Sequence, residues 1–204
     1  MEILNFGRTR NSSELEDFTI ASLIIGLAFS IALSAYTNQL YGPNFLLFYL
    51  PAGMLSGVSA FALHELAHRQ MAIRYGFQAR FRMWPFGVLF ALITSFLGFI
   101  FAAPGATEVY NVTNPELYGK ISAAGPITNM ILGLSFFSIS TVVGGTAGLV
   151  LTIAGSVNIA LAFFNLLPIP PLDGYKVFKW DTSIYLLMFV FAIVLLIVLD
   201  RGFF

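Results

Sequence analysis

Several stretches of this chain are apolar over the length that a helix needs to cross a lipid bilayer. They fall at residues 19–37, 46–71, 121–141, 148–167 and 183–199. Crossing the hydrocarbon core takes about 20 mainly apolar helical residues. Only 10% of the 204 residues are charged, against about 25% in an ordinary soluble domain. The sequence therefore predicts an all-α, multi-pass membrane bundle and excludes a water-soluble globule.

A further apolar segment, 86–103, decides whether the bundle has five or six transmembrane segments. The preceding alternation of apolar and polar residues over 77–82 predicts a short strand near the membrane interface. If 86–103 does not cross, every Lys and Arg except Arg201 lies on one side, which the positive-inside rule assigns to the cytoplasm. A crossing would move Lys120, Lys176 and Lys179 outside. We therefore expect a membrane-associated β or re-entrant element after the second helix.

The remaining composition limits the kinds of site that this chain can build. Residues 1–204 are predicted to form a single integral membrane domain, with a core of about 46–176, an N-terminal helix at 19–37 and a C-terminal helix at 183–199. Basic and acidic residues balance at ten each, so bulk charge gives no indication of nucleic acid. Cysteine is absent, which excludes disulfides and thiolate ligands. Any metal must be bound by nitrogen and oxygen atoms.

The two histidines of the chain, His64 and His68, flank Glu65 in the sequence HELAH within the second apolar segment. Helix positions four apart differ by about 40° in direction, so both imidazoles share a face and can bind one metal. In this HExxH pattern the histidines bind zinc, and the glutamate is the general base toward a zinc-bound water. Two histidines can be spaced this way by chance, but ionisable residues inside a membrane span are costly and usually functional.

A third protein ligand is expected, because catalytic zinc usually has three together with a water. Asp173 follows a proline-rich stretch at the inner end of a span, where a regular helix cannot form. The spans 121–141 and 148–167 lie between the histidines and Asp173, so the three residues reach the same depth only if 86–103 does not cross. The alternative for Asp173 is a helix cap or a partner of Lys176.

Two asparagines are further candidates for the site. Asn129 ends the sequence GPITN at 125–129, and Asn165 begins NLLPIPPLDG at 165–174. Each could bond a neighbouring helix. Each could equally orient the metal-bound water or hold a substrate carbonyl as oxyanion support, and the residues themselves leave both possibilities open.

Together, HELAH, GPITN and NLLPIPPLDG resemble, in order and spacing, the three signature segments of the site-2 protease family of intramembrane zinc metalloproteases. The resemblance covers about 46–176. It implies that His64, His68 and Asp173 bind one Zn²⁺ per chain and that Glu65 is the catalytic base. In that family a three-helix core holds the zinc on the cytosolic side, and membrane-associated strands help to present substrate. This chain differs in a longer apolar stretch after the first core helix and in having no recognisable PDZ or CBS module.

The resulting expectation is a metalloendopeptidase that cuts a partner protein within or near its transmembrane segment, from the cytoplasmic side of the cell membrane. The expected partners are a transmembrane protein substrate and membrane lipid, without nucleic acid, and the oligomeric state is open. The main alternative is a non-proteolytic multi-pass protein such as a metal ion transporter, in which the ionisable residues would form an ion path. These residues gather at one depth, which favours the protease. There are two further alternatives. One is a non-catalytic protein that binds partner helices through small residues, and the other is a zinc protease that acts on membrane-anchored soluble substrates.

Overall fold

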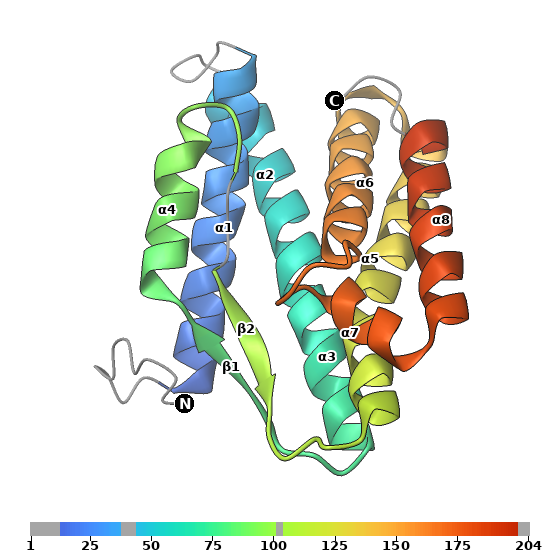
Figure 1. Cartoon of the computed structure of the whole chain (residues 1–204). Coiled ribbons are helices and arrows are strands. Elements are labelled where there is room, and N and C mark those ends of the chain that lie inside the picture. The colour runs from blue at the N-terminus through green and yellow to red at the C-terminus, as the bar shows by residue number, and fades with distance from the viewer. Residues whose placement is uncertain (1–12, 38–43, 101–103, 200–204) are drawn as a thin grey trace.

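The computed structural model describes residues 13–37, 44–100 and 104–199. Within these ranges, five helices are long and apolar enough to cross a membrane (Figure 1). They are α1 (Glu14–Tyr36), a continuous helix over Leu47–Arg74, α5 (Pro115–Val143), α6 (Gly145–Asn165) and α8 (Thr182–Leu199). The prediction of an all-α, multi-pass membrane protein is confirmed, while its treatment as a single domain stays a prediction.

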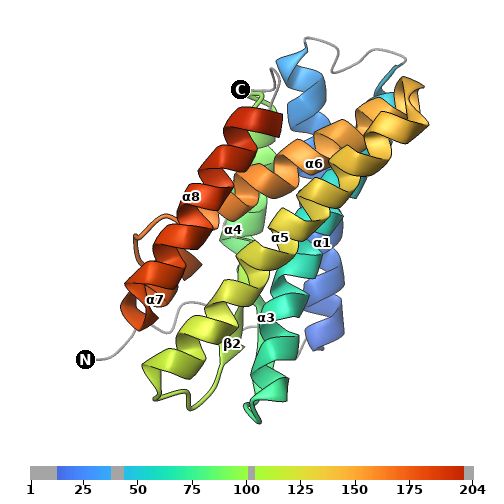
Figure 2. The same ribbon diagram turned by 90° about the vertical axis from the view of Figure 1, so that its right-hand side faces the viewer.

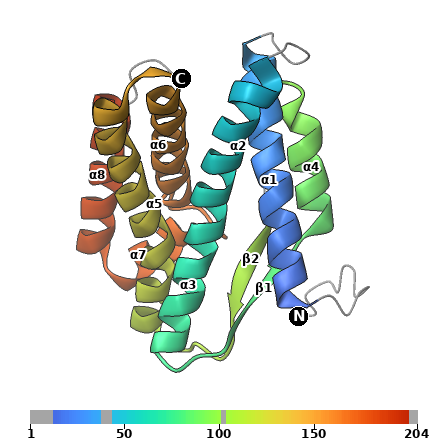
Figure 3. The same cartoon turned by 180° about the vertical axis from the view of Figure 1, so that it is seen from behind.

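The second long helix divides the bundle. It consists of η1 (Phe45–Tyr49), α2 (Leu50–Gly57), η2 (Val58–Ala62) and α3 (Leu63–Arg74), where η1 and η2 are π-helical turns. Seen from behind, α1 and α4 (Pro85–Ser95) lie on one side of it, and α5, α6 and α8 lie on the other (Figure 3). The view turned by 90° shows α5 and α6 running side by side along most of their length (Figure 2). The central helix therefore contacts both halves of the molecule.

Two helices begin earlier than their apolar residues predicted, because polar capping residues fix their starts. Ser13 and Glu16 form a reciprocal capping box at the start of α1. Asn114 accepts a hydrogen bond from the Glu116 backbone N–H at 2.9 Å, and Pro115 occupies the first turn of α5. Hydropathy alone does not register either signal.

The segment after α3 forms a hairpin that returns to the side from which it started. β1 (Ala79–Met83) pairs antiparallel with β2 (Gly105–Val109), with Met83 opposite Gly105. Between the strands, α4 has 11 residues, about half the length needed for a crossing. The expected re-entrant element is therefore present, although residues 101–103 of its predicted range lie outside the described residues. The strand predicted at 77–82 is found as β1, whereas β2 was not predicted.

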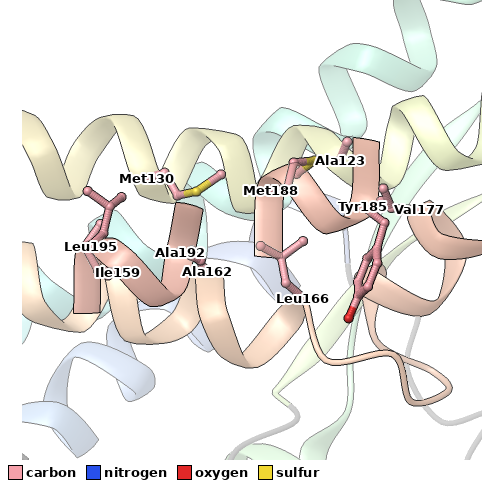
Figure 4. Packing of buried hydrophobic residues seen from close by; sticks show 10 residues of the cluster. All are labelled: Ala123, Met130, Ile159, Ala162, Leu166, Val177, Tyr185, Met188, Ala192 and Leu195. Carbon is pink, nitrogen blue, oxygen red and sulfur yellow. The ribbon is translucent and has the colours of Figure 1, made fainter. Parts of the chain in front are cut away.

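Two apolar clusters pack on either side of the central helix. One joins α5 and α6 to α8 and to α7 (Asp173–Trp180), a short helix that the sequence analysis did not predict (Figure 4). The other docks the hairpin onto the bundle through Phe81, which is 1% exposed. Its ring makes edge-to-face contacts with Phe18 of α1 and Phe61 of η2, at centroid distances of 5.4 and 5.7 Å. The sheet is thereby held beside α3.

Candidate metal centre

Three buried side chains from two distant parts of the chain meet between α3 and the start of α7. His64 and His68 lie one turn apart on α3, and Asp173 is the first residue of α7. Within the described ranges, these three residues form the group of His, Asp and Glu side chains that could hold a metal ion. The structure thus brings together the three residues that the sequence analysis named as ligands.

The potential ligand atoms of these residues form a nearly equilateral triangle. The Nε2 atoms of His64 and His68 are 3.0 Å apart, and Asp173 Oδ2 lies 3.2 Å from the first and 3.0 Å from the second. A tetrahedral zinc ion with bonds of about 2.0–2.1 Å has its ligand atoms about 3.3 Å apart. Two nitrogens and one carboxylate oxygen are also ligands that zinc accepts. The donor set and its spacing therefore fit one zinc ion.

The far side of one imidazole is fixed by the backbone of α5. His68 Nδ1 lies 2.9 Å from the Ile121 carbonyl oxygen. Because a carbonyl only accepts, Nδ1 carries the proton and Nε2 keeps its lone pair for a metal. His64 Nδ1 is buried, and among the described residues it has no hydrogen-bond partner. A buried group of this kind is normally satisfied by ordered water.

The two carboxylate oxygens of Asp173 have different neighbours. Oδ2 faces the histidines, whereas Oδ1 accepts a hydrogen bond from Lys176 Nζ at 3.2 Å. Lys176 also lies 5.4 Å from the centre of the Tyr118 ring. Burial raises the pKa of Asp173, but His68 and His64 lower it more, and the pKa lies well below its usual range. Asp173 thus pairs with Lys176, as one alternative from the sequence expected, and also faces the histidines. The other alternative, a helix cap, is not found, because Leu172 occupies the N-cap position of α7.

Gly125 of α5 lies directly against the triangle. A Cβ atom built on this residue would be 2.4 Å from His68 Nε2 and 2.5 Å from His64 Nε2. Only a residue without a side chain leaves space beside both ligand atoms. The sequence analysis quoted Gly125 within GPITN but did not assign it a place in the site, because the rotation of α5 relative to α3 is not encoded in a local pattern.

Glu65 is 9% exposed, and its carboxylate is bonded to the hairpin. Its Oε2 accepts a hydrogen bond from the Thr107 backbone N–H of β2 at 2.7 Å. The Thr107 hydroxyl donates to the Glu65 backbone carbonyl at 3.1 Å. Sequence reasoning missed Thr107, because its strand lacks the clear alternation that identified β1.

The two asparagines have different environments. Asn129 is completely buried on α5, and neither atom of its amide group has a hydrogen-bond partner among the described residues. Asn165 is half-buried at the end of α6, and its amide nitrogen donates to the Leu161 carbonyl of the same helix at 3.1 Å. Only Asn129 therefore offers an amide group that is unengaged within the described part of the chain.

Comparison with known proteins finds relatives that share one description. The chain is 36% identical over 176 residues to "Putative zinc metalloprotease MJ0611" of Methanocaldococcus jannaschii, covering 84% of this chain and 86% of the relative. It is 32% identical over 163 residues to "Putative zinc metalloprotease YwhC" of Bacillus subtilis, covering 69% and 72%. A third relative with the same description, from Mycobacterium tuberculosis, is 29% identical over 133 residues, which is 30% of its length. No family model matches the chain. No solved structure matches it.

Proposed function

Because this chain belongs to the site-2 protease family of zinc metalloproteases, we propose that it hydrolyses a peptide bond within or near the transmembrane segment of a partner protein. The observation that carries the proposal is that Asp173 of α7 meets His64 and His68, which flank Glu65 on a helix long enough to span a membrane. A metal ion transporter would need ionisable groups along a path through the bundle. The described groups that could hold a metal gather instead at one level.

The depth of the histidines supports a reaction inside the membrane. His68 and His64 precede Arg74, at the end of α3, by six and ten residues. At a helical rise of about 1.5 Å per residue, they lie about 9 and 15 Å from that end. The hydrocarbon core is about 30 Å thick. A peptide bond cut at this site would therefore lie within the membrane or just below its surface.

Each residue of the site has a distinct proposed role. His64, His68 and Asp173 hold the zinc ion, which when bound lowers the pKa of a water molecule and polarises a carbonyl oxygen. Glu65 accepts the proton of the attacking water and later donates it to the leaving amine. The unpartnered amide of Asn129 is suited to hold a substrate carbonyl or a water molecule. Asn165, which bonds its own helix, is a weaker candidate for that role.

Substrate recognition is proposed to use the outer edge of β2. Hydrogen bonds from Trp84 N to Pro104 O and from Tyr110 N to Gln78 O fix the pairing of the two strands. A helical substrate hides its carbonyls in its own hydrogen bonds, so it must unwind before cleavage. Pairing with a strand edge replaces the hydrogen bonds lost on unwinding. Substrates with helix-weakening residues near the cut are therefore expected.

The active site is proposed to face the cytoplasm from the cell membrane. The strands β1 and β2, the end of α3 and the start of α5 lie toward the same end of the bundle, whereas α4 extends beside α1 toward the other end (Figure 1). This end carries most of the basic residues, including Arg69, Arg74, Arg80 and Arg82. Basic residues near the ends of spans stay on the cytoplasmic side. Water would reach the metal from this end.

The proposal is tested by incubating a transmembrane test substrate with the purified protein in detergent and locating the cut by mass spectrometry. Glu65→Gln is the control, because it preserves the zinc ligands and removes the base. Cleavage inside the span by the wild type alone, with equal zinc in both samples, is the expected result. Equal cleavage by Glu65→Gln would contradict the assigned role of Glu65. Zinc-loaded wild type that cuts no membrane substrate would contradict the proposed activity.

A further inference from the structure

Thr107 and Phe81 occupy the same register position on the two strands of the hairpin. On either side of this position, the Tyr110 N–H donates to the Gln78 carbonyl and the Trp84 N–H donates to the Pro104 carbonyl. Residues 78 and 110 therefore form one hydrogen-bonded pair, and residues 84 and 104 form another. In an antiparallel ladder bonded and non-bonded pairs alternate, so Phe81 and Thr107 form a non-bonded pair. Their N–H groups therefore point away from the partner strand, toward the two outer edges of the sheet.

Each of these outer N–H groups is capped by a glutamate carboxylate. Phe81 N–H donates to Glu14 Oε1 of α1 at 3.0 Å, and the same oxygen accepts from Arg69 Nε at 2.8 Å. The β1 edge is thus closed by a carboxylate that is itself held by an ion pair. On the β2 edge, Thr107 N–H donates at 2.7 Å to the carboxylate of Glu65. The group that blocks the second edge is the proposed catalytic base.

A substrate strand and Glu65 compete for one donor. A strand that adds to the outer edge of β2 takes its hydrogen bonds from the outward N–H and C=O groups of that strand. Thr107 supplies one of these N–H groups, and one N–H group makes one strong hydrogen bond. While the Thr107 N–H is bonded to Glu65 Oε2, it is not available to a substrate strand, and pairing with that strand would release the carboxylate.

We propose that Thr107 is a positioning residue whose N–H holds the Glu65 carboxylate on the edge of β2 until a substrate strand takes over that N–H. Substrate pairing then frees Glu65 for proton transfer, so the base becomes fully active only when an extended segment lies along β2. This inference deepens the proposed function and rests on it. It would couple cleavage to the presence of an extended substrate segment.

Three zinc-loaded variants test the inference against the wild type. Thr107→Pro removes the N–H at a position where the ladder to β1 does not use it, so the strand tolerates proline. Thr107→Val removes only the hydroxyl group. Val109→Pro removes the equivalent outward N–H two residues along, which makes no contact with Glu65 in the described structure. Bound zinc per chain reports whether each variant folds, because none of these changes touches a zinc ligand.

Each protein is assayed with a transmembrane test peptide and with a capped dipeptide amide that is too short to lie along β2. For Thr107→Pro we expect the kcat for the dipeptide to rise by about tenfold, the size expected for loss of one charge-assisted hydrogen bond. The kcat/KM for the long peptide should fall, because one pairing bond is lost. Thr107→Val and Val109→Pro should not show this rise, because both keep the Thr107 N–H that bonds Glu65. A fall in dipeptide kcat for Thr107→Pro, or an equal rise for Val109→Pro, would overturn the inference.

A second measurement does not depend on cleavage. Hydrogen exchange at the Thr107 amide of the substrate-free protein should be faster in Glu65→Ala than in the wild type, while exchange at Val109 should be unchanged. Unchanged exchange at Thr107 would show that Glu65 does not hold this amide, and the inference would be wrong. Failure of the wild type to cut either peptide, with exchange at Thr107 faster in Glu65→Ala, would instead refute the proposed function.

Discussion

Replacing Gly125 by alanine is the most direct test of where the metal sits. In the interior of an ordinary helix, Gly→Ala stabilises by about 1 kcal/mol. Here the added methyl carbon would lie 2.4 and 2.5 Å from the Nε2 atoms of His68 and His64. Non-bonded contacts of carbon need about 3.5 Å, so α5 and the histidines would have to separate by about 1 Å. The methyl group would also occupy the space from which a metal is bound by both nitrogens.

The expected effect is therefore loss of zinc and turnover without unfolding. A displacement of about 1 Å at a reacting centre can cost about 100-fold in rate, and we expect at least this loss. Bound zinc per chain is measured by elemental mass spectrometry after dialysis against a zinc buffer. Turnover is measured with the transmembrane test peptide. Thermal unfolding of the metal-free proteins should show Gly125→Ala to be folded but destabilised by about 1–3 kcal/mol, the usual cost of overpacking a buried contact.

Gly148→Ala is the matched control. A Cβ on Gly148 would lie 3.1 Å from the Ser140 carbonyl oxygen, with its next neighbours at 3.9 Å, and it touches no proposed ligand. This variant should bind one zinc ion and keep its turnover. Full zinc binding and near-normal turnover by Gly125→Ala would refute the placement of the metal between α3 and α5.

Other residues give further predictions. Asp173→Ala removes a proposed ligand. Zinc affinity should therefore fall by more than the 10–100-fold that is lost when an outer hydrogen bond to a ligand is removed. A zinc titration with a competing chelator measures this affinity, and an unchanged value would show that Asp173 is not a ligand. Phe81→Ala empties the contact that docks the hairpin and should lower the unfolding free energy by about 3–5 kcal/mol. Limited proteolysis should then cut the hairpin faster while zinc stays bound, and an unchanged cleavage rate would contradict the docking role. Because the chain has no cysteine, Glu116→Cys should react with an impermeant thiol reagent only from the cytoplasm and Val142→Cys, at the other end of α5, only from outside. The reverse pattern would invert the proposed orientation.

The convergence of the candidate ligands could be predicted because it follows from periodicity and the order of the spans. The spacing of His64 and His68 fixes a shared helix face, and the number of crossings brings Asp173 to the same end of the bundle. The re-entrant element was predicted from the distribution of arginine and lysine around a segment that is apolar enough to cross. These are regular features that do not depend on side-chain packing.

The contacts that surround the ligands could not be predicted. Gly125 meets the imidazoles because of the rotation of α5 about its own axis, which depends on packing across the whole helix pair. Thr107 reaches Glu65 because a five-residue strand pairs with β1 in one particular register. The short helix α7 carries Asp173 but is too brief to give a hydropathy signal. The unengaged amide of Asn129 likewise depends on which neighbours happen to surround it.

The π-helical turn η2 has a consequence for how related sequences align with this one. It lies immediately before α3, and such a turn contains one more residue than an α-helical turn. Deleting one residue from Val58–Ala62 would restore a regular helix. Because the wide turn absorbs the extra residue, α3 would keep nearly the same rotation relative to α2, and His64 and His68 would still face Asp173. A single-residue gap at this point in a relative is therefore compatible with a retained metal site, whereas a gap in the regular turns of α2 would rotate the histidines by about 100°.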